Sequence, residues 1–389
     1  MKNVFKIIIV VSFFVILAGI IAYARGYRID FKKKSLLPTG ILAISSSPKA
    51  AKVFINGELK GATDINLTLI PGRYSVEIKK EGYLTWSRSF NLKGELVLPV
   101  EALLFPNNPS LSPLTSLGIV KAFPLDQTGK VIIFADNNDI TKDGIYFFDV
   151  SKKISLFPPL KQIILKQDLG LNPDINFGEA EVYFSPDYKQ MIADWGKNAY
   201  LLSIDDENAP LDVSYSKKVV VDAWEKEKEI EKLKIFETFP KDMVKIATES
   251  FKIISFSPDE TKVLYQARLP VELTPVLSPP MIAANQTQEE RTLKKDAFYV
   301  YDKKEDKNFR IYDQVDDSML WFPDSKHLIF KENKKIALTD YSGENKQTVY
   351  SGPFESSFFT TTSDGKIVVL INLNPDINKQ PDLYLVGIR

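Results

Sequence analysis

The sequence lacks most residues that build covalent cross-links and reactive centres. Its 389 residues include no cysteine and a single histidine, His327. The missing cysteines exclude disulfides, thiolate metal sites and cysteine nucleophiles. One histidine, without a Gly-x-Ser-x-Gly segment, does not support a Ser-His-Asp triad, and most zinc sites need more than one such ligand. We therefore expect no catalytic residue, no metal site and no cofactor.

The chain also lacks an excess of charge of either sign. Its 50 basic and 50 acidic residues give a formal net charge of zero. Without a positive field there is no general attraction for a phosphate backbone. We expect no nucleic-acid partner.

A long apolar run occurs at the N-terminus. Residues 7–23 are apolar or small, and residues 4–24 add only one lysine. A helix of about 21 residues is roughly 30 Å long, which spans a bilayer. We expect a transmembrane signal anchor and its flank over residues 1–30. Two alternatives remain: a buried core helix, and a secretory signal cleaved after Ala24, since Ala22-Tyr23-Ala24 has the small-x-small pattern.

The charges around this run bear on its orientation. Lys2 and Lys6 precede it, whereas Arg25, Arg28 and the lysines at 32–34 follow it. The positive-inside count therefore favours a cytoplasmic C-terminus. We nevertheless expect extracytoplasmic domains on a single-pass cell-membrane protein, because an N-terminal apolar segment before an all-β repeat domain is the usual layout of exported, tethered proteins.

Residues 40–105 have short segments of period-two alternation, which predict a small β-sandwich. Asn56-Gly57 favours a type I′ hairpin turn, because both residues tolerate a positive φ. Pro71-Gly72 predicts a second turn. The expected strands cover residues 41–45, 52–55, 73–79 and 96–98.

The order of these turns and strands resembles a PEGA domain. Pro48-Lys49-Ala50-Ala51 stands at the naming signature, and Gly82-Tyr83 closes the match, whereas Asp64 replaces the proline that often follows Thr63. The resemblance implies an envelope module with a spacer or adhesion role and no catalytic residues. Tyr83 and Trp86 are candidates for stacking on a sugar, although packing in the sheet is the alternative that we favour.

The rest of the chain contains a repeat of strand, Asp-bearing turn and strand. Proline presets φ in such a turn, and aspartate accepts from the backbone beyond it. A degenerate copy near Leu125-Asp126 brings the number of legible blades to five, and two insertions leave six or seven open. The turn residues are Ser185, Pro186 and Asp187; Ser257, Pro258 and Asp259; Pro323 and Asp324; and Ser363 and Asp364.

Each copy, with an outer strand, is most of a propeller blade, and blades must stack around an axis to bury both faces. The Ser-Pro-Asp turns followed by lysine and an aliphatic strand resemble the TolB-like (WD40-like) repeat over residues 106–389. The resemblance implies a β-propeller. Trp321-Phe322-Pro323-Asp324 lacks the serine, and Thr362-Ser363-Asp364 lacks the proline.

Two insertions interrupt the repeat. Residues 223–250 alternate Glu and Lys with spacings that pair on a helix, as in Glu225–Lys228, Glu229–Lys232 and Glu231–Lys234. We expect a helical hairpin, either plain or acting as a partner-binding arm. Residues 269–295 are rich in proline, which removes backbone donors, and predict a mobile loop that reaches over one face of the propeller or has no function.

Three polar segments are weaker candidates. The hexamer at 171–176 recurs at 373–378 and is ordinary turn chemistry rather than a ligand site. Residues 136–139 cluster oxygens as calcium sites do, but lack the closing bidentate acid. Residues 205–208 have the same interpretation, a solvated loop.

Together these features predict an all-β, membrane-anchored cell-envelope protein that binds rather than catalyses. Its propeller would present a surface to a protein or an envelope polysaccharide. The first alternative is a propeller that regulates an envelope peptidase or hydrolase. The second is a cytoplasm-facing membrane scaffold.

Overall fold

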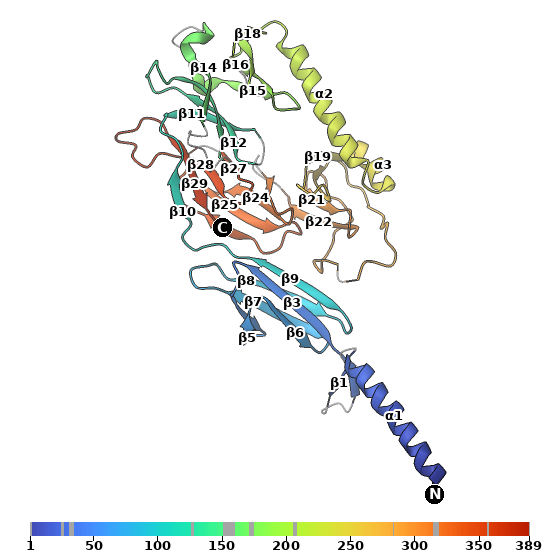
Figure 1. Cartoon of the computed structure of the whole chain (residues 1–389). Helices are drawn as coiled ribbons and strands as arrows, with labels where there is room; N and C mark the ends of the chain where they lie inside the picture. The colour runs from blue at the N-terminus through green and yellow to red at the C-terminus, as the bar shows by residue number, and fades with distance from the viewer. Residues whose placement is uncertain are drawn as a thin grey trace. The chain divides into compact units, whose positions relative to one another are not determined.

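The computed structural model describes most of the chain in two compact units. The described residues are 2–24, 27–30, 35–125, 128–150, 160–170, 175–204, 208–282, 284–313, 319–355 and 358–388. Unit 1 comprises Met1–Asn107 with Pro279–Gln286, and unit 2 comprises Asn108–Ser278 with Thr287–Arg389. Both units consist mostly of β-strands, as the sequence predicts (Figure 1).

Unit 1 begins with helix α1 (Lys2–Ala24), followed by the hairpin of β1 (Tyr27–Asp30) and β2 (Ser35–Pro38). Across the described residues, a search for a helix long and apolar enough to cross a membrane finds none. The expected transmembrane helix is therefore not established by the fold.

The remainder of unit 1 is a sandwich of two sheets. The first has the order β6-β3-β9, in which β3 and β9 are parallel, and the second has the order β5-β4-β7-β8. Alternate residues such as Leu42, Val53 and Trp86 are buried in the shared core, as period two requires. Asn56 and Gly57 have φ of 51° and 82°, which confirms the predicted turn. The strands are β3 (Gly40–Ser47), β4 (Lys52–Ile55), β5 (Glu58–Ala62), β6 (Ile65–Leu69), β7 (Gly72–Lys79), β8 (Trp86–Leu92) and β9 (Val97–Leu103).

Unit 2 contains five four-stranded antiparallel sheets within the described residues. Blade 1 has β11 (Ile119–Pro124), β12 (Lys130–Ala135), β13 (Gly144–Asp149) and β14 (Leu160–Leu165). Blade 2 has β15 (Glu181–Phe184), β16 (Gln190–Asp194), β17 (Ala199–Ser203) and β18 (Leu211–Asp212). Blade 3 has β19 (Phe251–Phe256), β20 (Lys262–Ala267), β21 (Phe298–Asp302) and β22 (Lys307–Tyr312). Blade 4 has β23 (Leu320–Trp321), β24 (His327–Glu332), β25 (Lys335–Asp340) and β26 (Gln347–Tyr350), and blade 5 has β27 (Phe359–Thr361), β28 (Ile367–Ile371) and β29 (Asp382–Gly387), completed by β10 (Ser110–Pro113).

The pairing of β10 with β29 closes the ring of blades, because it joins the start of unit 2 to its last blade. Blades 1 and 5 share a buried cluster that includes Val131 and Val368. The carboxylate of Asp382 in blade 5 accepts from Thr115 Oγ1 (2.9 Å) and from the backbone N of Leu117 (2.7 Å). This closure is that of a β-propeller.

The antiparallel order of each blade sorts its connections between two ends of the propeller. Turns between first and second strands, such as 257–261, lie at the same end as the connections between third and fourth strands, such as 303–306. We call this the turn end. The other connections lie at the insertion end, which includes helices α2 (Lys217–Phe236) and α3 (Lys241–Ser250) between blades 2 and 3 (Figure 1).

The proline-rich segment is more ordered than the sequence predicts. Leu273 and Leu293 are buried in the core of blade 3, and Glu272 forms a β-bridge with Thr292. Within unit 1, the Gln286 side chain both accepts from the backbone N of Asn91 and donates to its carbonyl. Part of this segment, Pro279–Gln286, belongs to unit 1.

Candidate functional site

The candidate site is a groove of about 550 Å³ between α2, α3 and β19. Its floor is apolar and includes Phe236, Ala247 and Phe251, all buried. Its α2 wall covers residues 222–236, which corresponds to roughly 20 Å of helix at 1.5 Å per residue. We call this hollow the α2 groove. Its volume is in the range of ligand sites.

Helix α2 is held at its two ends. At its start Val221 and Trp224 pack against blade 2, and Lys217 Nζ lies 2.6 Å from the buried carboxylate of Asp194. At its end Phe236 lies in the core of blade 3. The central turns have no such anchor, so Ile230 and Leu233 stay 44% and 46% exposed. A predicted solvated helix therefore keeps uncovered apolar side chains.

The groove rim is charged. Glu225 forms the predicted pair with Lys228 at 3.0 Å, and Asp222 pairs with Lys218 at 2.9 Å. The other two predicted pairs, Glu229–Lys232 and Glu231–Lys234, are not among the ion pairs of the described helix. Further cations in the lining are Lys226, Lys232, Lys252 and Arg268.

The Asp-bearing turns of blades 2, 3 and 5 share one hydrogen-bond pattern at the turn end. In blade 3 the hydroxyl of Ser257 donates to Asp259 (2.6 Å) and accepts from the backbone N of Lys262 (3.0 Å). Ser185 does the same in blade 2, with Asp187 at 2.7 Å. Pro186 and Pro258 occupy the turn position between hydroxyl and carboxylate. The Ser-Pro-Asp pattern is thus a structural turn.

In blade 5 the hydroxyl comes from a residue that the sequence prediction passed over. Thr362 Oγ1 donates to Asp364 (2.5 Å) and accepts from the backbone N of Lys366 (2.9 Å). Ser363 is exposed and stands where the other turns have proline. The register of the turn could have shown this, since Thr362 is two residues before Asp364, as Ser257 is before Asp259.

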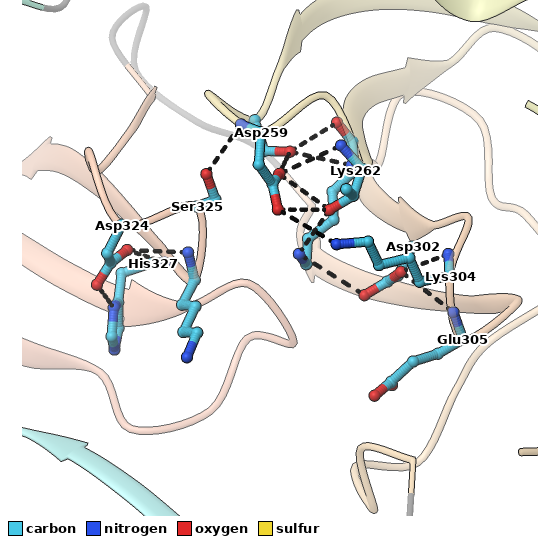
Figure 2. Close-up of polar contacts among 11 residues, drawn as sticks. Asp259, Lys262, Asp302, Lys304, Glu305, Asp324, Ser325 and His327 are labelled. Carbon is cyan, nitrogen blue, oxygen red and sulfur yellow. Dashed lines mark hydrogen bonds and ion pairs between the residues drawn. The ribbon is translucent and has the colours of Figure 1, made fainter. Parts of the chain in front are cut away.

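In blade 4 Phe322 stands where the other turns have the hydroxyl. The turn aspartate, Asp324, is bonded by His327 instead. Nδ1 of His327 lies 2.6 Å from Oδ2 of Asp324, and Nε2 lies 3.3 Å from Oδ1 of Asp340 (Figure 2 shows the Asp324 contact). Burial lowers the pKa of His327, but the two carboxylates outweigh it and raise the pKa to about 9. Pro323 precedes Asp324 in the turn. A doubly bonded imidazolium of this kind is a structural ion triad.

The turns of blades 3 and 4 are also joined to each other (Figure 2). The backbone N of Asp259 donates to Ser325 Oγ at 3.1 Å. Lys262 is buried and lies 3.8 Å from Asp302, whose carboxylate also accepts from the backbone N of Lys304. Burial raises the pKa of Asp259, but bonds from Ser257 and Thr261 outweigh it and lower the pKa to about 2.

The polar side chains at the turn end are engaged in contacts that hold the turns. Both ring nitrogens of His327 face carboxylates, Nδ1 that of Asp324 and Nε2 that of Asp340. In the described ranges no group of three or more His, Asp or Glu side chains could hold a metal ion. In the loop considered for calcium, Asp136 and Asp139 instead pair with Lys166 and Lys142.

The remaining predicted residues are in unit 1 or outside the described residues. Trp86 is buried and its ring stacks with Phe90 at 6.3 Å between centroids, so its indole is not available to a sugar. Tyr83 is half-buried against the same core. The segments 171–174, 205–207 and Asp126 lie outside the described residues.

Comparison with known proteins identifies one part of the chain. The model of the PEGA domain family matches residues 39–104. No curated protein matches the chain.

Solved structures give weaker similarities. A protein described as TolB from Agrobacterium tumefaciens is 12% identical over 62% of this chain and 65% of its own length, with a TM-score of 0.21. An oligogalacturonate lyase in complex with manganese is 9% identical over 82% of this chain and 86% of its own length, with a TM-score of 0.26. Dipeptidyl peptidase 4 of Porphyromonas gingivalis is 10% identical over 62% of this chain and 35% of its own length, with a TM-score of 0.19. This chain spans less than two thirds of the first and last of these proteins, and the TM-scores carry no argument. The propeller therefore follows from the strand order of unit 2, and residues 39–104 match the PEGA domain family.

Proposed function

We propose that this chain is a non-catalytic binding protein of the cell envelope, attached to the membrane by α1, whose propeller holds a protein or envelope polymer. The α2 groove carries the proposal, since an apolar hollow beside an incompletely covered helix is a typical binding surface. Loops and insertions at one end of a propeller are its usual binding elements.

Membrane attachment is supported by the exposed apolar surface of α1. Ile7, Phe14 and Ile20 along it are 62%, 61% and 59% exposed. Such a helix is stable in lipid, where its backbone groups are satisfied internally. In the sequence, residues 7–23 are apolar or small throughout, close to the roughly 20 residues that a membrane-spanning helix needs.

Two measurements test this function with the full-length chain. Extraction of membranes at high pH should leave the chain in the pellet, and a chain released to the supernatant would contradict attachment by α1. A screen of the detergent-solubilised chain against peptide, ester and glycoside substrates should give no turnover. Hydrolysis that is retained after repurification would replace the binding proposal with an enzymatic one.

The orientation has a second candidate, a scaffold that faces the cytoplasm. It is favoured by Arg25, Arg28 and the lysines at 32–34 after the apolar run. Protease added to intact cells should remove a C-terminal tag if the propeller is exported. Protection of the tag until lysis would establish the cytoplasmic alternative.

A further inference from the structure

The α2 groove combines an apolar floor with an excess of cations over anions in its lining. Its lining has five cations and three anions, namely Lys226, Lys228, Lys232, Lys252 and Arg268 against Asp222, Glu225 and Glu229. Two of the anions are already neutralised, Glu225 by Lys228 and Asp222 by Lys218. Four cations and a single acid, Glu229, then face the solvent of the groove. A ligand that fits this rim carries negative charge.

The dimensions of the groove favour a chain segment over a compact small molecule. Its α2 wall extends from Asp222 to Phe236, roughly 20 Å. Across from that wall, Val244 and Ala247 of α3 and Ile253 of β19 continue the lining. Leu233, 46% exposed on the α2 wall, adds an apolar side chain that a partner would cover. A purely charged polymer would not cover the apolar side chains of this lining.

We propose that the α2 groove binds an acidic, amphipathic segment of a protein partner. Apolar side chains of that segment would lie on Leu233, Val244 and Ile253, and its carboxylates would pair with Lys232 and Lys252. Such helix-in-groove docking takes affinity from the apolar contacts, while charge complementarity sets orientation and association rate. The inference rests on the proposed binding function and specifies its partner.

The test measures binding of fluorescein-labelled peptides to the full-length chain in detergent by anisotropy. The probe is a peptide of repeated Glu-Leu-Leu-Glu units, compared with its Lys-Leu-Leu-Lys counterpart. We expect binding of the acidic peptide that weakens with added salt, because exposed ion pairs are screened. Equal binding of both peptides, or no binding of the acidic one, would overturn the proposal.

Matched variants locate the binding. The double variant Lys232→Glu/Lys252→Glu should weaken the acidic peptide about tenfold, since two exposed attractions become repulsions. Leu233→Ser should weaken it as well. The control Lys335→Glu/Lys379→Glu changes two lysines that are also exposed, on blade 4 and on the β28–β29 connection of blade 5, and should leave affinity unchanged. Loss in the control, or retention in both groove variants with unchanged circular dichroism, would contradict the assignment.

Three further probes separate the partner classes. Poly-glutamate, polygalacturonate and phosphatidylglycerol vesicles offer negative charge without an amphipathic peptide. Competition by any of them as strong as that of the acidic peptide would overturn the choice of a protein segment. It would leave the broader binding function intact, because that function fails only if the propeller captures no partner at all.

Discussion

Nδ1 of His327 and Oδ2 of Asp324 are 2.6 Å apart, and this contact replaces the serine–aspartate bond of the neighbouring blade. In blade 3 the same aspartate position, Asp259, is bonded by Ser257 at 2.6 Å. In blade 4 a histidine three residues after the turn aspartate therefore bonds its carboxylate, whereas in blade 3 a serine hydroxyl two residues before the aspartate does so.

Replacement of His327 by Ala should destabilise blade 4. It leaves the half-buried carboxylates of Asp324 and Asp340 without the cation between them, which costs about 3 kcal/mol. Hydrogen exchange of the β24 amides in the full-length chain measures the change. Unchanged protection of β24 would show that the triad is dispensable.

The same triad predicts a pH dependence. The pKa of His327 rises to about 9 in the folded chain, above its ordinary value of 6.5, so its contribution is complete below pH 6.5 and is lost as the pH rises through about 9. The difference in β24 protection between the native chain and His327→Ala should shrink over this window. A difference that is constant from pH 6 to pH 10 would contradict the charged imidazole.

The turn of blade 5 distinguishes two adjacent residues. Thr362→Val removes the hydroxyl that accepts from the backbone N of Lys366, which should cost about 1–3 kcal/mol. Ser363→Ala should be nearly neutral, because Ser363 is exposed. Urea unfolding followed by tryptophan fluorescence compares them. The opposite order would restore the assignment made from sequence.

Closure of the ring depends on Asp382. Asp382→Ala leaves Thr115 and the backbone N of Leu117 without their acceptor, and we expect a loss of about 1–3 kcal/mol and faster exchange of β10. The exposed Asp376 gives the control variant Asp376→Ala. Equal effects of the two variants would deny Asp382 a role in closure.

The core of the PEGA domain predicts the outcome for Trp86. Trp86→Ala removes a ring that is 4% exposed and should cost about 3–5 kcal/mol, whereas Val97→Ala, on an exposed side chain of β9, should cost little. Limited proteolysis of the full-length chain reports the stability of this domain. A stable Trp86→Ala domain would reopen the sugar-contact interpretation.

Much of the fold is predictable because it depends on local chemistry. Period-two alternation and the Asn56-Gly57 turn mark the sandwich, and the Ser185 and Ser257 turns mark two blades. The role of Thr362 in the blade 5 turn follows from its position two residues before Asp364, which matches that of Ser257 before Asp259.

Other features depend on contacts distant in sequence. No local signal places β10 (Ser110–Pro113) beside β29 (Asp382–Gly387), since the partners are at opposite ends of unit 2. The proline-rich segment 269–295 is predicted to be a mobile loop. The Gln286–Asn91 hydrogen bonds and the burial of Leu273 instead hold parts of it in place, and both depend on residues outside the segment. The Glu–Lys spacing predicts helix α2, but it does not predict which apolar residues of the helix the propeller leaves uncovered, and the α2 groove depends on those residues.

Site-specific photo-cross-linking tests the central claim, that the propeller binds a partner through the α2 groove. A photoreactive amino acid replaces Lys232 in the full-length chain in intact cells, and a second variant carries it at Lys335. We predict a discrete covalent adduct at position 232 and none at 335. No adduct at 232, or equal adducts at both positions, would contradict the account.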